Sequence, residues 1–83
     1  MTRRGKLLAK SRNNPAGIRF SELCSLAGHF GFRKKGGKGS HIVYVRENVE
    51  EILTFQNVKG KAKPYQVRQL LALLDKYRLE EEE

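Results

Sequence analysis

The sequence predicts a two-layer α+β sandwich, in which two helices cover one face of a three-stranded antiparallel sheet. Two segments, 18–32 and 64–78, place apolar residues at helical spacing, and the stretch between them is rich in β-branched and aromatic residues. A chain of 83 residues is long enough for one domain and too short for two. The expected order is helix, strand, strand, strand, helix, with room for an extra N-terminal helix.

The first segment, 2–12, fits either a short helix or a frayed basic arm. Thr2 is a candidate N-cap and Asn13-Asn14-Pro15 is a stop signal, whereas Gly5 weakens a helix here. The chain is therefore divided into a basic N-terminal arm or short helix at 1–17, a domain at 18–79 and an acidic tail at 80–83.

The helix expected within 18–32 should bury one face. Ser21 is a plausible N-cap, Glu22 suits the first turn, and Gly31 can end the helix in a left-handed conformation. The residues at the spacing of one buried face, with two neighbours beside them, are Phe20, Leu23, Cys24, Ala27, Leu26 and Phe30.

Two strands are expected at 40–46 and 50–56, joined by a hairpin link at 47–49. A third, edge strand around 32–35 would pair with the first of them across a glycine-rich basic loop at 33–39. In the second strand, Ile52, Thr54 and Gln56 alternate with Leu53 and Phe55.

A second basic loop, 57–63, leads into the last helix, where Pro64 suits the first turn. The apolar face of that helix is formed by Val67, Leu70, Leu71 and Leu74, with Tyr77 extending it.

Both faces of the first central strand carry apolar residues, with Ile42 and Tyr44 on one and Val43 and Val45 on the other. Two helices cover only one face of such a sheet. The second face is therefore expected to meet either a partner chain or the N-terminal helix folded across it.

The charge is the strongest global signal. The chain has 17 Lys and Arg against nine Asp and Glu, a net charge of +8. Residues 1–40 carry ten of the basic residues and one acid, whereas residues 41–83 are nearly balanced. This distribution favours a polyanionic partner, first of all nucleic acid, over a basic surface that serves only solubility.

Several classes of protein are disfavoured by the sequence: disulfide-stabilised, secreted, membrane-spanning, and metal- or cofactor-dependent proteins. Cys24 is the only cysteine, which excludes a disulfide framework, suits a reducing cytoplasm and is interpreted as a small buried apolar residue. No signal-peptide core and no membrane-spanning apolar run is present, so we expect a cytoplasmic protein with no membrane partner. The sequence has no zinc-binding cluster, Walker loop or dinucleotide fingerprint, so no metal or cofactor is expected.

His41 stands where the glycine-rich stretch passes into the strand. An imidazole titrates near ~6.5 and can accept or donate a proton at cellular pH. Because RNA carries its own nucleophile, the 2′-hydroxyl, an enzyme that cuts it needs mainly a proton acceptor and cations around the phosphate. Composition alone nevertheless favours a histidine that simply begins a strand, and His29 is interpreted as a residue that suits a helix C-terminus.

The stretch KGSHIVYV at 38–45, followed by VKGKAKPYQVRQLLALLDKY at 58–77, resembles the HicA family of bacterial toxins over roughly 18–77. The most specific element is the triplet Gly39-Ser40-His41 at the start of a strand. Many members have a second histidine or a large polar residue after this triplet, where this chain has Ile42.

The resemblance implies a double-stranded-RNA-binding-domain-like fold and a toxin–antitoxin pair. It implies a metal-independent endoribonuclease that cleaves mRNA, arrests translation and growth, and is neutralised by a HicB-like antitoxin. His41 would be the catalytic residue. The residues expected to bind RNA are Arg33, Lys34, Lys35, Lys38, Gly39, Ser40, Lys59, Lys61 and Lys63.

The alternative function is a non-catalytic RNA-binding module of the same fold, such as a ribosome-associated protein. The basic loops fit both functions, but a pure binder needs no imidazole at position 41. A DNA-binding regulator is less favoured, because the sequence shows no helix-turn-helix with a basic recognition helix.

Overall fold

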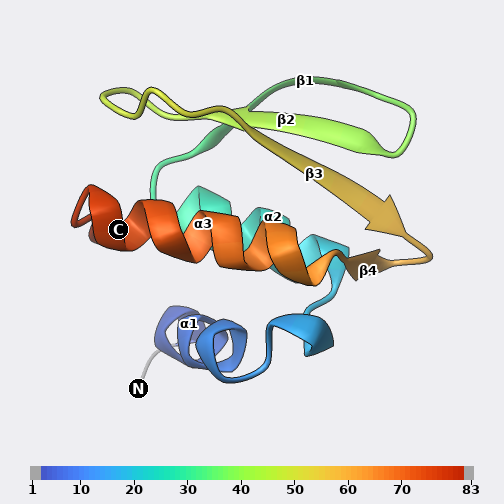
Figure 1. Ribbon diagram of the computed structural model, residues 1–83, viewed down its shortest axis with the longest axis horizontal. Coiled ribbons are helices and arrows are strands. Elements are labelled where there is room, and N and C mark those ends of the chain that lie inside the picture. Colours follow the sequence, from blue (N-terminus) through green and yellow to red (C-terminus); the bar gives the residue numbers. More distant parts are fainter. Residues whose placement is uncertain (1–2, 82–83) are drawn as a thin grey trace.

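The computed structural model describes residues 3–81 and has three layers: a sheet, α2 and α3 packed on one of its faces, and α1 on the far side of those helices (Figure 1). The elements are α1 (Arg3–Asn13), the 3-10 helix η1 (Pro15–Gly17), α2 (Phe20–His29), β1 (Arg33–Lys38), β2 (His41–Val45), β3 (Leu53–Val58), β4 (Lys61–Ala62) and α3 (Pro64–Lys76). The sheet described within residues 3–81 has four antiparallel strands in the order β1-β2-β3-β4, so the predicted count of three is wrong: the short β4 lies in the stretch predicted as a basic loop. The predicted α+β sandwich is confirmed and is compatible with the double-stranded-RNA-binding-domain-like fold; the predicted cap at Thr2 lies outside the described residues.

The N-terminal segment is a helix that packs against the helical layer. Leu7 packs against the core, and the Nζ atom of Lys10 lies 2.9 Å from a carboxylate oxygen of Glu22 in α2. A second ion pair of 2.9 Å joins Arg12 to Asp75 in α3. Because these contacts hold α1 to α2 and α3, the expectation that the helix folds across the second sheet face is wrong.

The start of α2 differs from the prediction, because Arg19, and not Ser21, is its N-cap. Arg19 is extended, with φ −77° and ψ 154°, and its N–H donates to the Glu22 carboxylate at 2.9 Å. That hydrogen bond is the first cause of a lowered pKa of Glu22. The predicted left-handed end at Gly31 is confirmed, with φ 87°.

The glycine-rich stretch predicted as a loop is mostly strand. β1 continues to Lys38, and only Gly39, with φ 63°, and Ser40 form the turn into β2. At Gly37 a Cβ atom would lie 2.6 Å from the carbonyl oxygen of His41. Glycine is therefore needed here for the close approach of two strands.

The link between β2 and β3, residues 46–52, is longer than the predicted hairpin link and contacts the C-terminal end of α3. The Glu51 carboxylate accepts hydrogen bonds from the Lys76 Nζ at 2.7 Å and from the Tyr77 hydroxyl at 2.6 Å. These bonds, that of Lys76 first, lower the pKa of Glu51 to about 2. β3 begins at Leu53, three residues later than predicted.

The second predicted basic loop is a tight hairpin between β3 and β4. Lys59 and Gly60 connect the strands with φ 52° and 84°, the pattern of a two-residue type I′ turn. The Asn57 side chain stabilises the turn by accepting a 2.7 Å hydrogen bond from the Gly60 N–H.

The core lies between the sheet and the two helices. Its buried residues include most of those predicted: Leu23, Leu26, Ala27, Phe30, Leu53, Phe55, Val67, Leu70, Leu71 and Leu74. The Tyr44 ring packs 5.3 Å from that of Phe55, and burial raises the pKa of Tyr44 to about 12. Cys24 is half-buried rather than fully buried, and burial also raises the pKa of its thiol, so it is not an activated nucleophile.

The other face of the sheet is open within the described chain, because α1 lies beyond the helices (Figure 1). Val43 is paired with Thr54, and Val45 with Arg33, on this outer face. Ile52 and Val58 add exposed apolar surface, with 59% and 41% of their areas exposed. The apolar second face that the sequence predicted is therefore accessible to a partner.

Candidate functional site around His41

His41 is the first residue of β2 and its side chain lies exposed on the outer face of the sheet. Its cross-strand partners are Lys38 in β1 and Gln56 in β3. The next pair, Ile42 with Phe55, faces the core. Because successive strand residues point to opposite faces, the imidazole points away from the helices.

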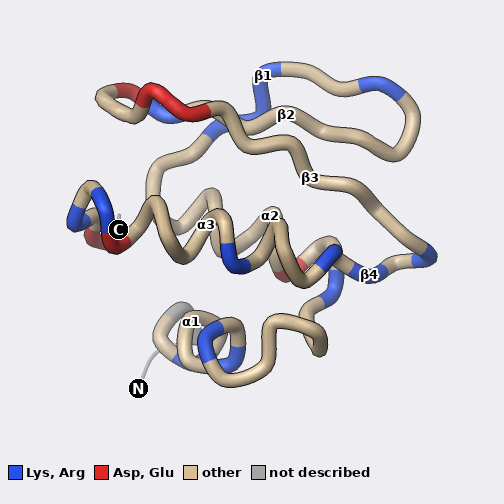
Figure 2. Tube along the Cα trace, viewed as in Figure 1, with Lys and Arg blue, Asp and Glu red and all other residues tan. Residues whose placement is uncertain are grey.

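Several lysines lie along the backbone at the end of the sheet where His41 begins β2 (Figure 2). They are Lys38 opposite His41, Lys59 and Lys61 in the β3–β4 hairpin, and Lys63 at the N-cap of α3. The acids Glu47, Glu50 and Glu51 lie in the link at the opposite end of β2 and β3. The histidine end of the sheet is thus rich in lysine, whereas the opposite end combines these acids with the basic residues at the start of β1.

The remaining predicted cations do not join this group. Arg33, Lys34 and Lys35 open β1 at the far end of the sheet. Lys38 lies five residue steps after Arg33, a distance of roughly 16 Å at about 3.3 Å per step. Lys34 pairs with Tyr44, so it lies on the helix side of the strand. The predicted RNA-binding set is therefore divided into two groups.

A hydrogen-bond chain fixes the start of α3 to the strand beside His41. The Gln66 side-chain Oε1 accepts from the backbone N–H of Gln56 at 2.8 Å, and Gln66 Nε2 donates to the Tyr65 hydroxyl at 3.3 Å. The Lys63 Nζ lies 5.8 Å from the centre of the Tyr65 ring. Sequence reasoning missed Gln66, although its spacing of four residues from Leu70 places a polar residue on the apolar stripe.

His29, the other histidine, occupies the last turn of α2, and its buried Nδ1 has no hydrogen-bond partner in the structure. α2 ends beside the start of β1, away from His41. Within residues 3–81, no group of three or more His, Cys, Asp or Glu is placed to hold a metal ion. The same residues include no helix long and apolar enough to cross a membrane.

An exposed imidazole beside several ammonium groups can accept a proton while the cations attract a phosphodiester. The strand pairing on both sides of His41 fixes its backbone, which favours a defined position of the ring. Such an arrangement suits acid–base chemistry on a polyanionic ligand.

Comparison with known proteins identifies the family. Residues 20–75, about two thirds of the chain, match the family described as HicA toxin of bacterial toxin-antitoxin. The match includes the whole sheet, all of α2 and all of α3 except Lys76, and α1 and η1 precede it. No curated protein and no solved structure matches the chain. The chain belongs to the HicA family: it is the toxin of a toxin–antitoxin pair and has a cognate antitoxin as its partner.

Proposed function

We propose that this toxin is a metal-independent endoribonuclease that cleaves mRNA with His41 as its single catalytic histidine. The observation that carries the proposal is the exposed imidazole of His41 directly opposite Lys38, at the lysine-rich end of an open sheet. Family membership supports it, because the toxin must act on a cellular target. Cleavage of mRNA would arrest translation and growth.

In the proposed reaction, His41 accepts the proton of a ribose 2′-hydroxyl. The 2′-oxygen bonds to the adjacent phosphorus, and the bond from phosphorus to the 5′-oxygen breaks. The leaving 5′-oxygen takes a proton from water, the hydroxide so formed takes back the proton held by His41, and the 2′,3′-cyclic phosphate remains on the other product. Lys38 stabilises the added negative charge of the phosphorane, a contribution of several kcal/mol for a well-placed group, on the order of 2.7–4.

The RNA would cross the histidine end of the sheet. Lys38, Lys59, Lys61 and Lys63 would contact phosphates, and the turn of Gly39 and Ser40 would lie beside the cleaved linkage. Arg33, Lys34 and Lys35 lie too far along β1 to touch the same phosphate. They would bind RNA only beyond the cleavage point.

The test compares wild type with His41→Ala on a long RNA in the presence of chelator. Wild type should cut and leave a 2′,3′-cyclic or 3′-phosphate, whereas the variant should bind RNA and leave it intact. Circular dichroism of the variant checks the fold, which should be unchanged because the side chain is exposed. Equal cutting by the variant would exclude the His41 mechanism. RNA binding without cleavage by wild type would instead favour the non-catalytic RNA-binding module.

We further propose that the antitoxin is HicB-like and covers the outer face of the sheet. Val43, Val45 and Val58 supply apolar contact area there, and the lysines beside them suit an acidic partner. A stable complex would bury about 1,200–2,000 Å². Co-expression with the adjacent small reading frame, size-exclusion chromatography and a cleavage assay test this. A neighbour that copurifies while RNA cutting continues at full rate would contradict inhibition by covering the site.

A further inference from the structure

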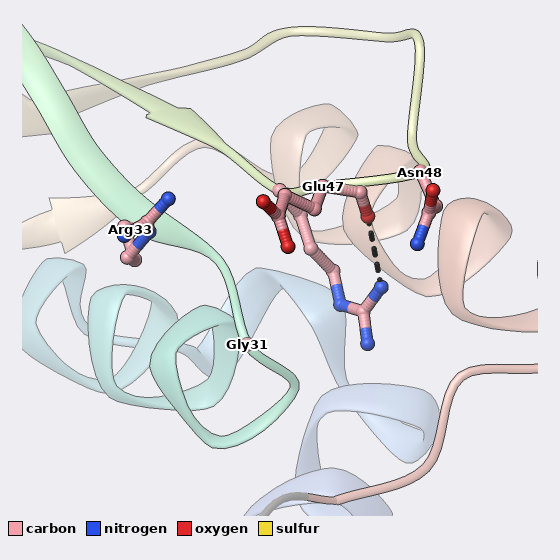
Figure 3. A pocket seen from close by; sticks show the side chains of 5 residues that line it. Gly31, Arg33, Glu47 and Asn48 are labelled. Carbon is pink, nitrogen blue, oxygen red and sulfur yellow. Dashed lines mark hydrogen bonds between the residues drawn. The ribbon is translucent and has the colours of Figure 1, made fainter.

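A cavity of about 350 Å³ lies at the end of the sheet opposite His41 (Figure 3). It is lined by Gly31, Arg33, Arg46, Glu47 and Asn48, from the α2–β1 turn, the start of β1 and the link that follows β2. Its size is within the range of small-molecule sites, roughly 300–1,000 Å³. None of the chemistry proposed for His41 uses this cavity.

The cavity is built on a fixed guanidinium. Arg46 Nε donates to the Phe30 carbonyl at 2.7 Å, and Arg46 Nη1 donates to the Glu47 carbonyl at 3.1 Å, the bond drawn as a dashed line in Figure 3. These bonds tie the end of β2 to the end of α2. The guanidinium therefore presents a planar cation in a defined orientation, which suits stacking of a nucleobase.

The lining combines groups that suit different parts of a nucleotide. Arg33 is exposed and can reach a phosphate, whereas Glu47 presents a carboxylate and Asn48 an amide (Figure 3). A carboxylate would repel an isolated phosphate. It would instead accept hydrogen bonds from N–H groups on a base edge. A ligand with one anionic part and one N–H-donating aromatic part satisfies all of these groups.

We propose that this cavity binds one nucleotide of the RNA, preferably guanosine, several nucleotides from the cleaved linkage. Arg33 holds its phosphate, the base stacks on Arg46, and Glu47 and Asn48 bind the base edge. Guanine is preferred because its neighbouring N1–H and N2–H groups match the two oxygens of a carboxylate, whereas the other bases present fewer donors there. The inference rests on the proposed RNA substrate and adds a specificity site to it.

The two sites are far enough apart to hold different nucleotides. Arg46 directly follows β2 and lies five residues after His41, roughly 16 Å at the rise of an extended strand. A strand of RNA held at both points would lie along β1 and β2. The cavity would then select which linkage reaches His41.

The test measures binding of the four nucleoside 5′-monophosphates to the wild-type protein by NMR of its backbone amides. A mononucleotide has no linkage to cleave, so binding is measured separately from catalysis. GMP should shift the amides of Gly31 and Asn48 and bind at least about fivefold more tightly than AMP, CMP or UMP. Inorganic phosphate that shifts these amides as strongly as GMP would reduce the cavity to an anion site and overturn the proposal.

Variants identify the groups responsible. Glu47→Gln should abolish the preference for GMP, whereas Glu50→Gln, which removes the same charge from the same link outside the cavity, should retain it. Arg33→Gln should weaken all four nucleotides alike, and Arg68→Gln on α3 should weaken none. Unchanged preference in Glu47→Gln would overturn the proposal. None of these binding measurements depends on RNA cutting. A failure of the nucleotide proposal can therefore be distinguished from a failure of the proposed RNA cleavage by His41.

Discussion

The side-chain Oε1 of Gln66 accepts a 2.8 Å hydrogen bond from the backbone N–H of Gln56. β4 pairs with β3 only at Asn57 and Val58, so no strand reaches the Gln56 N–H. The neighbouring Asn57 N–H points the other way and donates to the Ser40 carbonyl at 2.9 Å. A glutamine side chain thus takes the place of a missing strand and joins the first turn of α3 to the strand that pairs with His41.

Gln66→Leu should destabilise the protein by about 1–3 kcal/mol, because it leaves a part-buried N–H without its acceptor. Gln69→Leu, on the exposed face of the same helix, is the matched control and should change the stability much less. Urea unfolding followed by circular dichroism measures both. Equal stability of the two variants would show that water replaces the Gln66 amide.

Gly37→Ala should disturb the site through the backbone. The added Cβ would meet the His41 carbonyl oxygen at 2.6 Å and the Ile42 Cα at 3.1 Å, and backbone atoms cannot rotate aside. We expect a loss of about 1–3 kcal/mol and reduced RNA cutting.

Gly36→Ala is the control for Gly37→Ala, because a Cβ there has nothing within 4 Å and the φ angle is not left-handed. It should be neutral, or more stable by about 0.4–1 kcal/mol. Thermal unfolding and RNA cleavage rates are measured for both glycine variants. Similar behaviour of both variants would mean that β1 shifts without cost.

The sequence was sufficient to predict the core helices and the division of the β2 residues between the two sheet faces, because both follow from the periodicity of apolar residues. Val67, Leu70 and Leu74 lie at helical spacing and are buried as expected. The glycine stretch was misjudged, because its composition is typical of a loop. What makes it a strand is the close approach of Gly37 to β2, a tertiary contact.

The candidate site was predicted only in part, because the same stretch was interpreted as a loop. Reading 33–39 as a flexible loop placed Arg33 and Lys38 near one phosphate, whereas a strand separates them. Gln66 and the cavity behind Arg46 were not anticipated. The bonds of Gln66 to Gln56 and of Arg46 to Phe30 join residues 10 and 16 positions apart, and no local pattern indicates them.

Lys59→Asn should stabilise the β3–β4 hairpin. Lys59 has φ 52°, a left-handed conformation that costs most residues roughly 1–2 kcal/mol and that asparagine tolerates better. A gain of up to about 1 kcal/mol is expected. Lys61→Asn removes the same charge from a strand position and should give no gain. Chemical unfolding measures the stability of both variants. An equal change in stability would show that the effect comes from the lost charge and not from the backbone conformation.

Glu51→Gln should remove a pH-dependent contribution to stability. Lys76 and Tyr77 lower the pKa of Glu51 to about 2, below its ordinary value of 4.5. A lowered folded-state pKa means that the contribution is complete above the ordinary value and is lost as the pH falls towards 2. Wild type should therefore melt at a higher temperature than the variant at pH 7, and the difference should shrink between pH 4.5 and 2. A constant difference across this window would contradict the assignment.

The two groups of cations should contribute differently to RNA binding. Changing Lys59, Lys61 and Lys63 together to Gln should weaken binding and make the dependence of log K on log salt shallower by up to ~2, because each phosphate contact with a single strand contributes about 0.7. The control is a second triple variant with the same loss of charge at the other end of β1, in which Arg33, Lys34 and Lys35 are changed to Gln.

A short RNA that spans only the histidine end distinguishes local contact from overall charge. On that RNA the lysine variant should show the shallower slope, whereas the β1 variant should resemble wild type. A longer RNA should restore a slope change to the β1 variant, because it reaches Arg33. Filter-binding or fluorescence titrations over a range of salt measure both RNAs. Equal slopes for the two variants on the short RNA would show that net charge, rather than phosphate contact at the histidine end, determines the affinity.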